Sequence, residues 1–215
     1  MTPAPQARPP GAPAARRRLT REARRHQLVS AAMPIVADGG LAEFALDDVA
    51  AAAGVTRNLL YHYFPRGRAD VAVAVVERAG RELTGGWVTD EDLSLEQRLA
   101  ANFARVIDHA LRPTMAWRIH RLARASGDPE VAAIHERFGE VVVASISLNH
   151  LGTPEPPPLV RVALRGYLAF FETALDEARR AATSRDELTR LLTDTLVAAV
   201  QAALAAAGRE DQAER

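Results

Sequence analysis

The chain has 215 residues and a formal net charge of zero at pH 7, and it contains neither cysteine nor lysine. This length fits one large domain or a small and a medium domain, and the lack of cysteine excludes disulfide bonds and thiol catalysis. No apolar stretch reaches the ~20 residues needed to cross a membrane, so we expect no membrane segment and a cytoplasmic location.

The N-terminal segment changes from apolar to basic. Residues 1–15 are rich in proline and alanine, lack the layout of a signal peptide, and are expected to form a disordered tail. Residues 16–70 contain nine arginines and six acidic residues. Residues 71–215 contain seventeen arginines and twenty-one acidic residues. The basic excess suits neutralisation of DNA phosphates, although arginine runs also occur in solvated termini.

The long helix expected after the arginines contains Pro34. A proline inside a helix removes a backbone donor and can cost ~3 kcal/mol or more, so we expect a kink near Ser30 rather than a break. Ala45 lies ahead of the next helix and offers no capping hydroxyl, and loss of a cap typically costs ~1 kcal/mol.

Residues 46–64 predict two short helices joined at a glycine. Apolar residues at helical spacing indicate a first helix over residues 47–53, and Gly54 supplies the positive φ that follows many helix C-termini. Thr56 is a suitable N-cap for a second helix over residues 57–63, which Phe64 and Pro65 end. The unit has the form of a helix-turn-helix.

The second short helix carries suitable base-reading side chains at its N-terminal end, where major-groove recognition needs them. Arg57 can bond guanine in bidentate fashion, Asn58 can pair with the edge of adenine, and Leu59 can contact a thymine methyl. The side chains expected to contact the DNA backbone are Arg16, Arg17, Arg18, Thr56, Tyr61, His62, Tyr63 and Arg68. A helical domain without a DNA function can also contain such a helix pair, and the basic arm beside it favours DNA binding.

Residues 21–83 resemble the N-terminal DNA-binding domain of the TetR family of transcriptional regulators. The resemblance is carried by Ser30-Ala31-Ala32, Gly39-Gly40, Phe44, the segment LDDVA from Leu46, Ala53-Gly54-Val55-Thr56 and Leu60-Tyr61-His62-Tyr63-Phe64. It implies a homodimer that binds a double-stranded DNA operator with two half-sites. It also implies a C-terminal helical domain that binds a small-molecule inducer, and release from DNA when the inducer binds.

The rest of the chain keeps a helical period to its end, so the predicted fold class is all-α. Helices are expected over residues 69–83, 94–111, 114–125, 128–148, 159–182 and 184–207, with a proline-rich loop at 152–158. The predicted organisation is a three-helix helix-turn-helix DNA-binding domain over residues 16–67, a connecting helix over 68–84, and a helical ligand-binding and dimerisation domain over 85–215.

The last two predicted helices each carry an apolar stripe. The residues expected at a dimer interface, in the four-helix bundle that the family resemblance implies, are Leu164, Tyr167, Leu168, Phe171, Leu188, Leu192, Thr195, Leu196, Ala199 and Ala203. Each stripe can equally face the core of its own chain, and the sequence leaves that alternative open.

The ligand pocket is expected among the middle helices, as in this fold class. Its predicted lining residues are Phe103, Ile107, Met115, Trp117, His120, Phe138, Val142 and Ser145. These helices offer few polar groups, so an apolar or amphipathic ligand is favoured. The face that carries Trp117 and His120 can instead be solvated or pack on the DNA-binding domain.

Catalytic and metal-binding motifs are missing from the sequence. There is no GxSxG and no GxxxxGK, and His135-Glu136 lacks the second histidine of HExxH. Six scattered histidines give no zinc-ligand spacing, although two can meet in space, so we expect no metal and no cofactor. The predicted function is a ligand-responsive, sequence-specific DNA-binding repressor and not an enzyme. The alternative is a sequence-indifferent, nucleoid-type DNA-binding protein.

Overall fold

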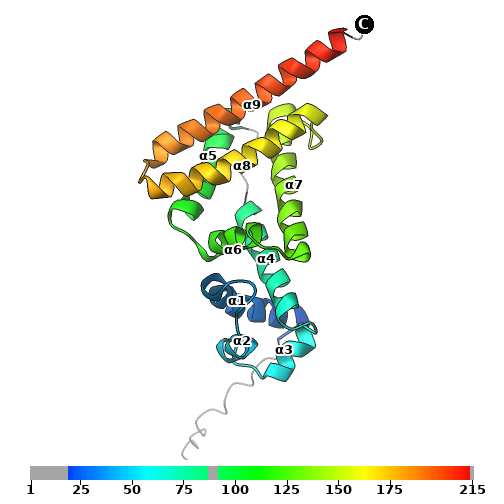
Figure 1. Ribbon diagram of the computed structural model, residues 1–215, viewed down its shortest axis with the longest axis vertical. Helices are drawn as coiled ribbons and strands as arrows, with labels where there is room; N and C mark the ends of the chain where they lie inside the picture. Colours follow the sequence, from blue (N-terminus) through cyan, green and yellow to red (C-terminus); the bar gives the residue numbers. More distant parts are fainter. Residues whose placement is uncertain (1–18, 87–91, 214–215) are drawn as a thin grey trace, which may run out of the picture.

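The computed structural model describes residues 19–86 and 92–213, and these residues form α-helices without a strand (Figure 1). The all-α prediction is confirmed. The helices of the described residues are α1 (Arg21–Gly39), α2 (Leu46–Ala52), α3 (Arg57–Tyr63), α4 (Arg68–Thr84), α5 (Leu95–Leu111), α6 (Met115–Arg124), α7 (Pro129–Leu151), α8 (Pro158–Arg180) and α9 (Arg185–Ala213). The predicted tail over residues 1–15 and the arginines 16–18 lie outside the described residues.

The three N-terminal helices pack around a small apolar core at one end of the molecule (Figure 1). Leu28 of α1, Val49 of α2 and Leu60 of α3 are fully buried. Gln27 also donates a hydrogen bond to the Ala53 carbonyl at 3.0 Å, which ties α1 to the end of α2. Helix α1 continues through Pro34 without a break, as the sequence predicted.

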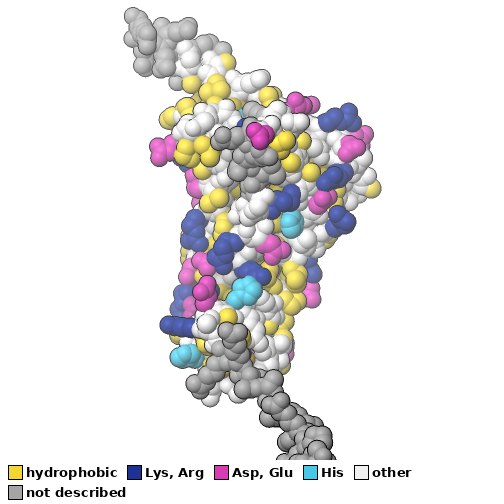
Figure 2. All heavy atoms as spheres, turned by 180° about the vertical axis from the view of Figure 1, so that it is seen from behind, with side chains coloured by type: hydrophobic (Ala, Val, Ile, Leu, Met, Phe, Trp, Pro, Cys, Tyr) yellow, Lys and Arg dark blue, Asp and Glu magenta, His cyan; other side chains and the backbone are white. Residues whose placement is uncertain are grey.

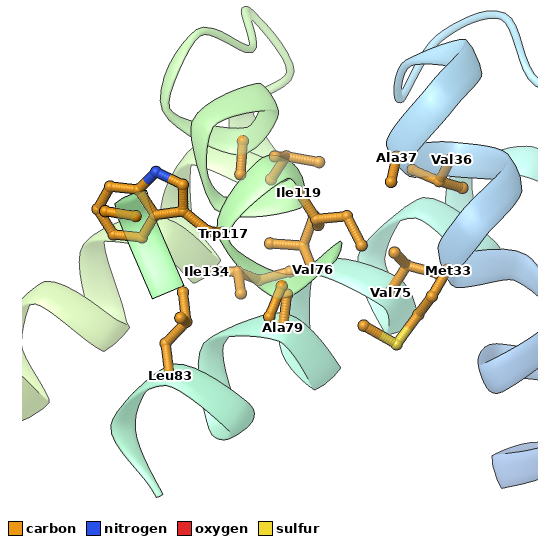
Figure 3. Packing of buried hydrophobic residues seen from close by; sticks show 14 of the residues in the cluster. Met33, Val36, Ala37, Val75, Val76, Ala79, Leu83, Trp117, Ile119 and Ile134 are labelled. Atoms are coloured by element: carbon orange, nitrogen blue, oxygen red, sulfur yellow. The ribbon is translucent and has the colours of Figure 1, made fainter. Parts of the chain in front are cut away.

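Helix α4 joins these three helices to the rest of the chain. It contacts α1 on one side and α6 and α7 on the other. Figure 3 shows Val75 near Met33 of α1, and Val76 near Ile119 of α6. Since both sets belong to one continuous cluster of buried residues, the core extends through α4 without a polar gap.

Helices α5, α8 and α9 pack on one another at the far end, and α9 extends past the body of the molecule (Figure 1). The Tyr167 hydroxyl of α8 donates a buried hydrogen bond to the Leu192 carbonyl of α9 at 2.9 Å. This contact fixes the register of the two helices. The left-handed residue Gly152 ends α7, and α8 begins at Pro158, so the proline-rich loop lies where it was predicted.

Residues 185–208 of α9 are long and apolar enough to cross a membrane by length and composition. The expectation that no segment reaches this length was therefore wrong. Polar residues such as Asp194 and Gln201 interrupt the apolar run without making the segment polar on average. Leu188, Leu192 and Leu196 on one side of α9 are buried within the chain itself, whereas only 22% of the apolar window is buried in all. A single helix of this kind is weak evidence for a membrane segment.

Candidate nucleic-acid interface and ligand cavity

The turn between α2 and α3 presents the start of α3 to solvent. Gly54 has a φ of 64°, which a glycine adopts without strain. The Thr56 side chain accepts a hydrogen bond from the Leu59 backbone amide at 3.3 Å and so caps α3, as predicted. Because Leu60 is fully buried beneath the helix, Arg57 and Asn58 face outward, and Leu59 is half-buried.

Arg57 is held in place by its neighbours. Its guanidinium donates to Asp47 at 2.9 Å and to the Tyr61 hydroxyl at 3.5 Å, and it lies over the Tyr61 ring at 5.7 Å from the centroid. The hydrogen bond with Tyr61 and the charge of Asp47 both raise the pKa of Arg57, so it is a permanent cation. A fixed cation at the N-terminal end of an exposed helix is suited to guanine recognition.

The side chains predicted to contact the DNA backbone have different surroundings. Tyr61 and His62 are exposed, and Tyr63 is half-buried with its ring edge against His62. Arg68 donates to the Ala42 carbonyl at 2.8 Å and lies over the Phe44 ring, so its guanidinium supports the loop before α2. Arg16, Arg17 and Arg18 are outside the described residues.

A cavity of about 260 Å³ lies among α4, α5, α6, α7 and α8. Five of the residues predicted for the ligand pocket line it: Phe103, Trp117, His120, Phe138 and Val142. The other three lie outside this lining: Ile107 is fully buried in the core, Met115 is 46% exposed, and Ser145 is half-buried. These three lie on other faces of their helices.

The end of α4 forms part of the cavity wall through Gly80, Leu83 and Thr84. A β-carbon built at Gly80 would collide with the ring of Phe138 on α7. The absence of a side chain at Gly80 therefore permits the close approach of α4 and α7, and the Phe138 ring that occupies this space also lines the cavity.

A polar cluster interrupts the apolar wall. Glu172 of α8 accepts hydrogen bonds from His120 at 2.9 Å and from Arg124 at 3.0 Å, and Arg124 also pairs with Asp176 at 3.1 Å. The rings of Trp117, His120 and His135 stack in succession, with centroids 5.2 Å and 4.9 Å apart.

Burial and neighbouring charges set the ionisation of this cluster. Burial lowers the pKa of His135, and the charge of His120 acts in the same direction. Burial raises the pKa of Glu172, but the hydrogen bond from His120 and the positive charges around it outweigh burial, so the net pKa lies below its usual value. The cavity wall thus holds a carboxylate and a neutral imidazole at neutral pH.

The sequence did not indicate His135, Glu172 or Arg165 as cavity residues, although the structure places all three in the lining. His120 and Glu172 are 52 positions apart in the sequence and belong to different helices. No local spacing signals such a contact. The only hint was that two of the scattered histidines can meet in space, as His120 and His135 do.

Comparison with known proteins agrees with this geometry. The family model described as bacterial regulatory proteins, tetR family, matches residues 28–75, which run from α1 into α4 and include the helix-turn-helix. A tetR-family transcriptional regulator from Streptomyces coelicolor is 24% identical with a TM-score of 0.67, over 87% of this chain and 90% of that one. The chain therefore resembles the TetR family over residues 28–75 and shares the fold of this regulator over most of its length.

Other solved structures share the TetR fold at lower identity. The fatty acid degradation regulator FadR from Bacillus halodurans is 15% identical with a TM-score of 0.60, over 81% of this chain and 97% of that one. The multidrug binding protein EbrR, complexed with imidazole, is 18% identical with a TM-score of 0.58, over 80% of this chain and 94% of that one. No curated protein matches the chain. The similarity to the tetR-family model covers residues 28–75, and the proteins from Streptomyces coelicolor and Bacillus halodurans that share the fold are named as regulators.

Two polar contacts join the TetR DNA-binding helices to the cavity helices. Arg118 of α6 bonds the Ala37 carbonyl at 2.8 Å and the Asp38 carboxylate at 2.7 Å, where a cation also complements the C-terminus of α1. Arg66, in the turn before α4, forms a bidentate pair with Glu130 at the start of α7, at 2.8 and 3.0 Å. These contacts link α6 to the end of α1, and α7 to the turn between α3 and α4.

Most of the residues predicted for the TetR dimer interface face the interior of their own chain. The buried ones are Leu164, Tyr167, Phe171, Leu188, Leu192, Leu196 and Ala203. Tyr167, Leu168 and Phe171 moreover line the cavity. The seven buried side chains are covered mainly by their own chain, and Leu168 is half-buried at the cavity. Thr195 and Ala199 are half-buried.

Proposed function

We propose that the protein is a ligand-responsive repressor that binds a palindromic operator as a homodimer in the cytoplasm and is released by a small apolar or amphipathic inducer. One observation carries the proposal: α4 lines the cavity near its C-terminal end, packs on α1, and follows α3 directly through the turn at residues 64–67. A ligand that displaces the cavity end of α4 therefore also moves α3.

The DNA side of the proposal rests on α3. Arg57, Asn58 and Leu59 are assigned to base edges, and Thr56, Tyr61, His62, Tyr63, Arg68 and the arginines 16–18 to phosphates. Asp47, which pairs with Arg57, would have to share that cation with a base. Phosphate contacts position the helix, and each one adds about −0.9 to the slope of log affinity against log salt.

The cavity supports an inducer with a large apolar part and a small polar group. Its wall is mainly Leu, Val, Ile and aromatic side chains, while His120, Arg124 and His135 gather around Glu172. Regulators with the same fold carry names that point the same way, FadR to fatty acid degradation and EbrR to multidrug binding. An amphipathic ligand can fill the apolar wall and place a polar end at the cluster.

The homodimer is assigned to the outward faces of α8 and α9. Val162 of α8 is 66% exposed, Leu191 of α9 is 51% exposed, and Phe170 of α8 is also exposed. Figure 2 shows the face opposite to that of Figure 1, with hydrophobic side chains toward the end where α9 projects and charged side chains interspersed along the middle. Two copies that cover Val162, Phe170 and Leu191 would form a bundle of four helices.

The proposed release from DNA depends on the distance between the two recognition helices of the dimer. Two recognition helices must enter successive major grooves about 34–36 Å apart. The dimer can adopt a DNA-binding conformation and a second conformation in which the recognition helices are a different distance apart. An inducer that binds the second conformation more tightly lowers operator affinity, by at most the ratio of its affinities for the two conformations. In the proposed repressor, α4, Arg118 and Arg66 link inducer occupancy to that spacing.

Selection of bound duplexes from a random DNA pool at near-physiological salt tests the proposal. A two-fold symmetric motif is the expected result, and Arg57→Ala should relax base preference by ~1–3 kcal/mol at one position of each half-site. The matched control is Arg21→Ala, an exposed arginine of α1, which should weaken all sequences alike. If no motif is recovered and binding only weakens with salt, sequence-indifferent DNA binding replaces the proposal.

A further inference from the structure

Three potential metal ligands meet at one edge of the cavity. They are His120 of α6, His135 of α7 and Glu172 of α8, and one ligand atom from each lies within 4.8 Å of the other two. His120 Nε2 is 2.9 Å from Glu172 Oε1, and His135 Nε2 is 3.9 Å from the same oxygen. All three side chains line the cavity, so the point between them adjoins open space.

One of these three potential ligand atoms makes no hydrogen bond within the described part of the chain. His135 Nε2 is buried and has no hydrogen-bond partner among the described residues. A buried polar atom without a partner lowers the stability of the folded protein. The cost is removed when the nitrogen coordinates a cation.

The distances from the two histidine nitrogens to Glu172 Oε1 are close to those between ligand atoms in a tetrahedral zinc site. Zinc–nitrogen and zinc–oxygen bonds of about 2.0–2.1 Å place neighbouring ligand atoms about 3.3–3.4 Å apart. The two distances to Glu172 Oε1, 2.9 and 3.9 Å, lie on either side of that value. Shifts of about half an ångström bring both histidines to that distance from Glu172 Oε1, and the ligand atoms of the two histidines lie within 4.8 Å of each other.

The surroundings orient the ligands. Trp117 stacks on the His120 ring, and His120 stacks on the His135 ring, which limits rotation of both imidazoles. Arg124 bonds the second oxygen of Glu172, Oε2, and leaves Oε1 directed toward the histidines. The positive charge of Arg124 is balanced by Asp176, at 3.1 Å. Residues that contact the ligands of a metal site without binding the metal hold those ligands in position.

We propose that His120, His135 and Glu172 bind one divalent cation of the zinc class, with a further coordination position open to the cavity. Two imidazoles and a carboxylate select zinc, cobalt or nickel over magnesium and calcium, which prefer oxygen ligands alone. Three protein ligands with an open position can take water or a donor atom of a cavity ligand. The cation replaces the His120–Glu172 hydrogen bond and joins α6, α7 and α8 at one point.

The site is tested on chelator-treated, full-length protein without DNA, so its outcome is independent of the proposed repressor function. Titration with zinc chloride in a calorimeter should give one site per chain. Titration with cobalt chloride should give the visible absorption of a four- or five-coordinate ion. The same metal should raise the thermal midpoint, because a ligand that binds only the folded state stabilises it.

Two variants make the assignment specific. His135→Ala and Glu172→Gln should each weaken zinc binding by more than the roughly 10–100-fold typical of losing an outer partner, and should abolish the cobalt spectrum. His62→Ala, which removes an exposed histidine of α3, should leave both unchanged. Equal zinc affinity in His135→Ala and the parent overturns the proposal. So does the absence of saturable binding by the parent protein, a result that needs no variant.

Discussion

At the scale of single residues, Tyr167 is the clearest anchor of the C-terminal helices. Its buried hydroxyl bonds the Leu192 carbonyl at 2.9 Å, and burial raises its pKa. We expect Tyr167→Phe to lower the free energy of unfolding by ~0.5–1.5 kcal/mol, the net worth of one such bond. Urea denaturation measures the change. Tyr63→Phe, on half-buried Tyr63, is the control and should stay within ~0.5 kcal/mol of the parent.

The cluster at the cavity wall makes stability depend on pH. Burial lowers the pKa of His135 from 6.5, so between that value and its folded pKa only the unfolded chain binds the proton. Stability should therefore fall as the pH drops below 6.5. Glu172, with a pKa below 4.5, contributes in the same direction only at lower pH.

Urea midpoints between pH 8 and pH 5 measure this dependence in metal-free protein. His135→Gln should flatten the decline, but only in part, because burial lowers the pKa of His150 as well. An unchanged slope in His135→Gln would show that His135 keeps its usual pKa in the folded protein.

The residues of α3 were predictable because their roles depend on order along one short helix. Thr56 had to cap, and Leu60 had to face inward, which leaves Arg57 and Asn58 outside. Glu172 was not predictable. Its two cavity partners come from other helices, and nothing in the local sequence of α8 distinguishes it from other acidic residues on helix surfaces.

At the scale of helices, α2 is the weakest-capped part of the helix-turn-helix. Its N-cap residue, Ala45, makes no side-chain capping bond, although Asp48 lies at the third helical position. Ala45→Thr should raise the free energy of unfolding by ~0.5–2 kcal/mol. Differential scanning calorimetry measures the gain. Ala42→Thr, in the exposed loop before α2, should have little effect. A gain from Ala42→Thr equal to that from Ala45→Thr would contradict capping as the cause.

Helix positions were predicted well because glycine, proline and capping residues mark their ends. Thr114 and Asp128, for example, cap α6 and α7 as side-chain acceptors. The apolar stripes of α8 and α9 were located correctly, and the structure shows that most of their side chains are buried within their own chain, the alternative that the sequence left open. A stripe shows which side of a helix avoids water, and it does not show whether the covering helix belongs to the same chain.

At the scale of the whole molecule, the exposed apolar side chains of α8 and α9 predict dimerisation. The double variant Val162→Glu, Leu191→Glu places charges on both helices and should shift the dimer toward monomer by at least ~1.4 kcal/mol, a tenfold change. Sedimentation equilibrium measures this. Met115→Glu, on exposed Met115 of α6, is the control and should leave the dimer intact. Unchanged association of the double variant would move the interface elsewhere.

The overall arrangement was predictable as far as the resemblance extended, from α1 into α4. A ligand cavity among the middle helices was expected. Its lining was only partly identified from the sequence, because the helices that form it are distant from one another along the chain. Phe103 and Phe138 were assigned correctly because both lie on apolar sides of amphipathic helices. Arg165 was missed because charged residues are usually placed on the solvent side.

The contact between Gly80 and Phe138 limits which substitutions position 80 can accept during evolution. Any larger residue at position 80 would displace the aromatic ring opposite it, and would thereby alter the cavity shape and the separation of α4 and α7 in one step. For a repressor that works as proposed, new ligand preferences cannot arise at this position without changing the response of the DNA-binding helices. Variation in ligand choice is therefore expected first on the walls formed by α5 and α8, away from this contact.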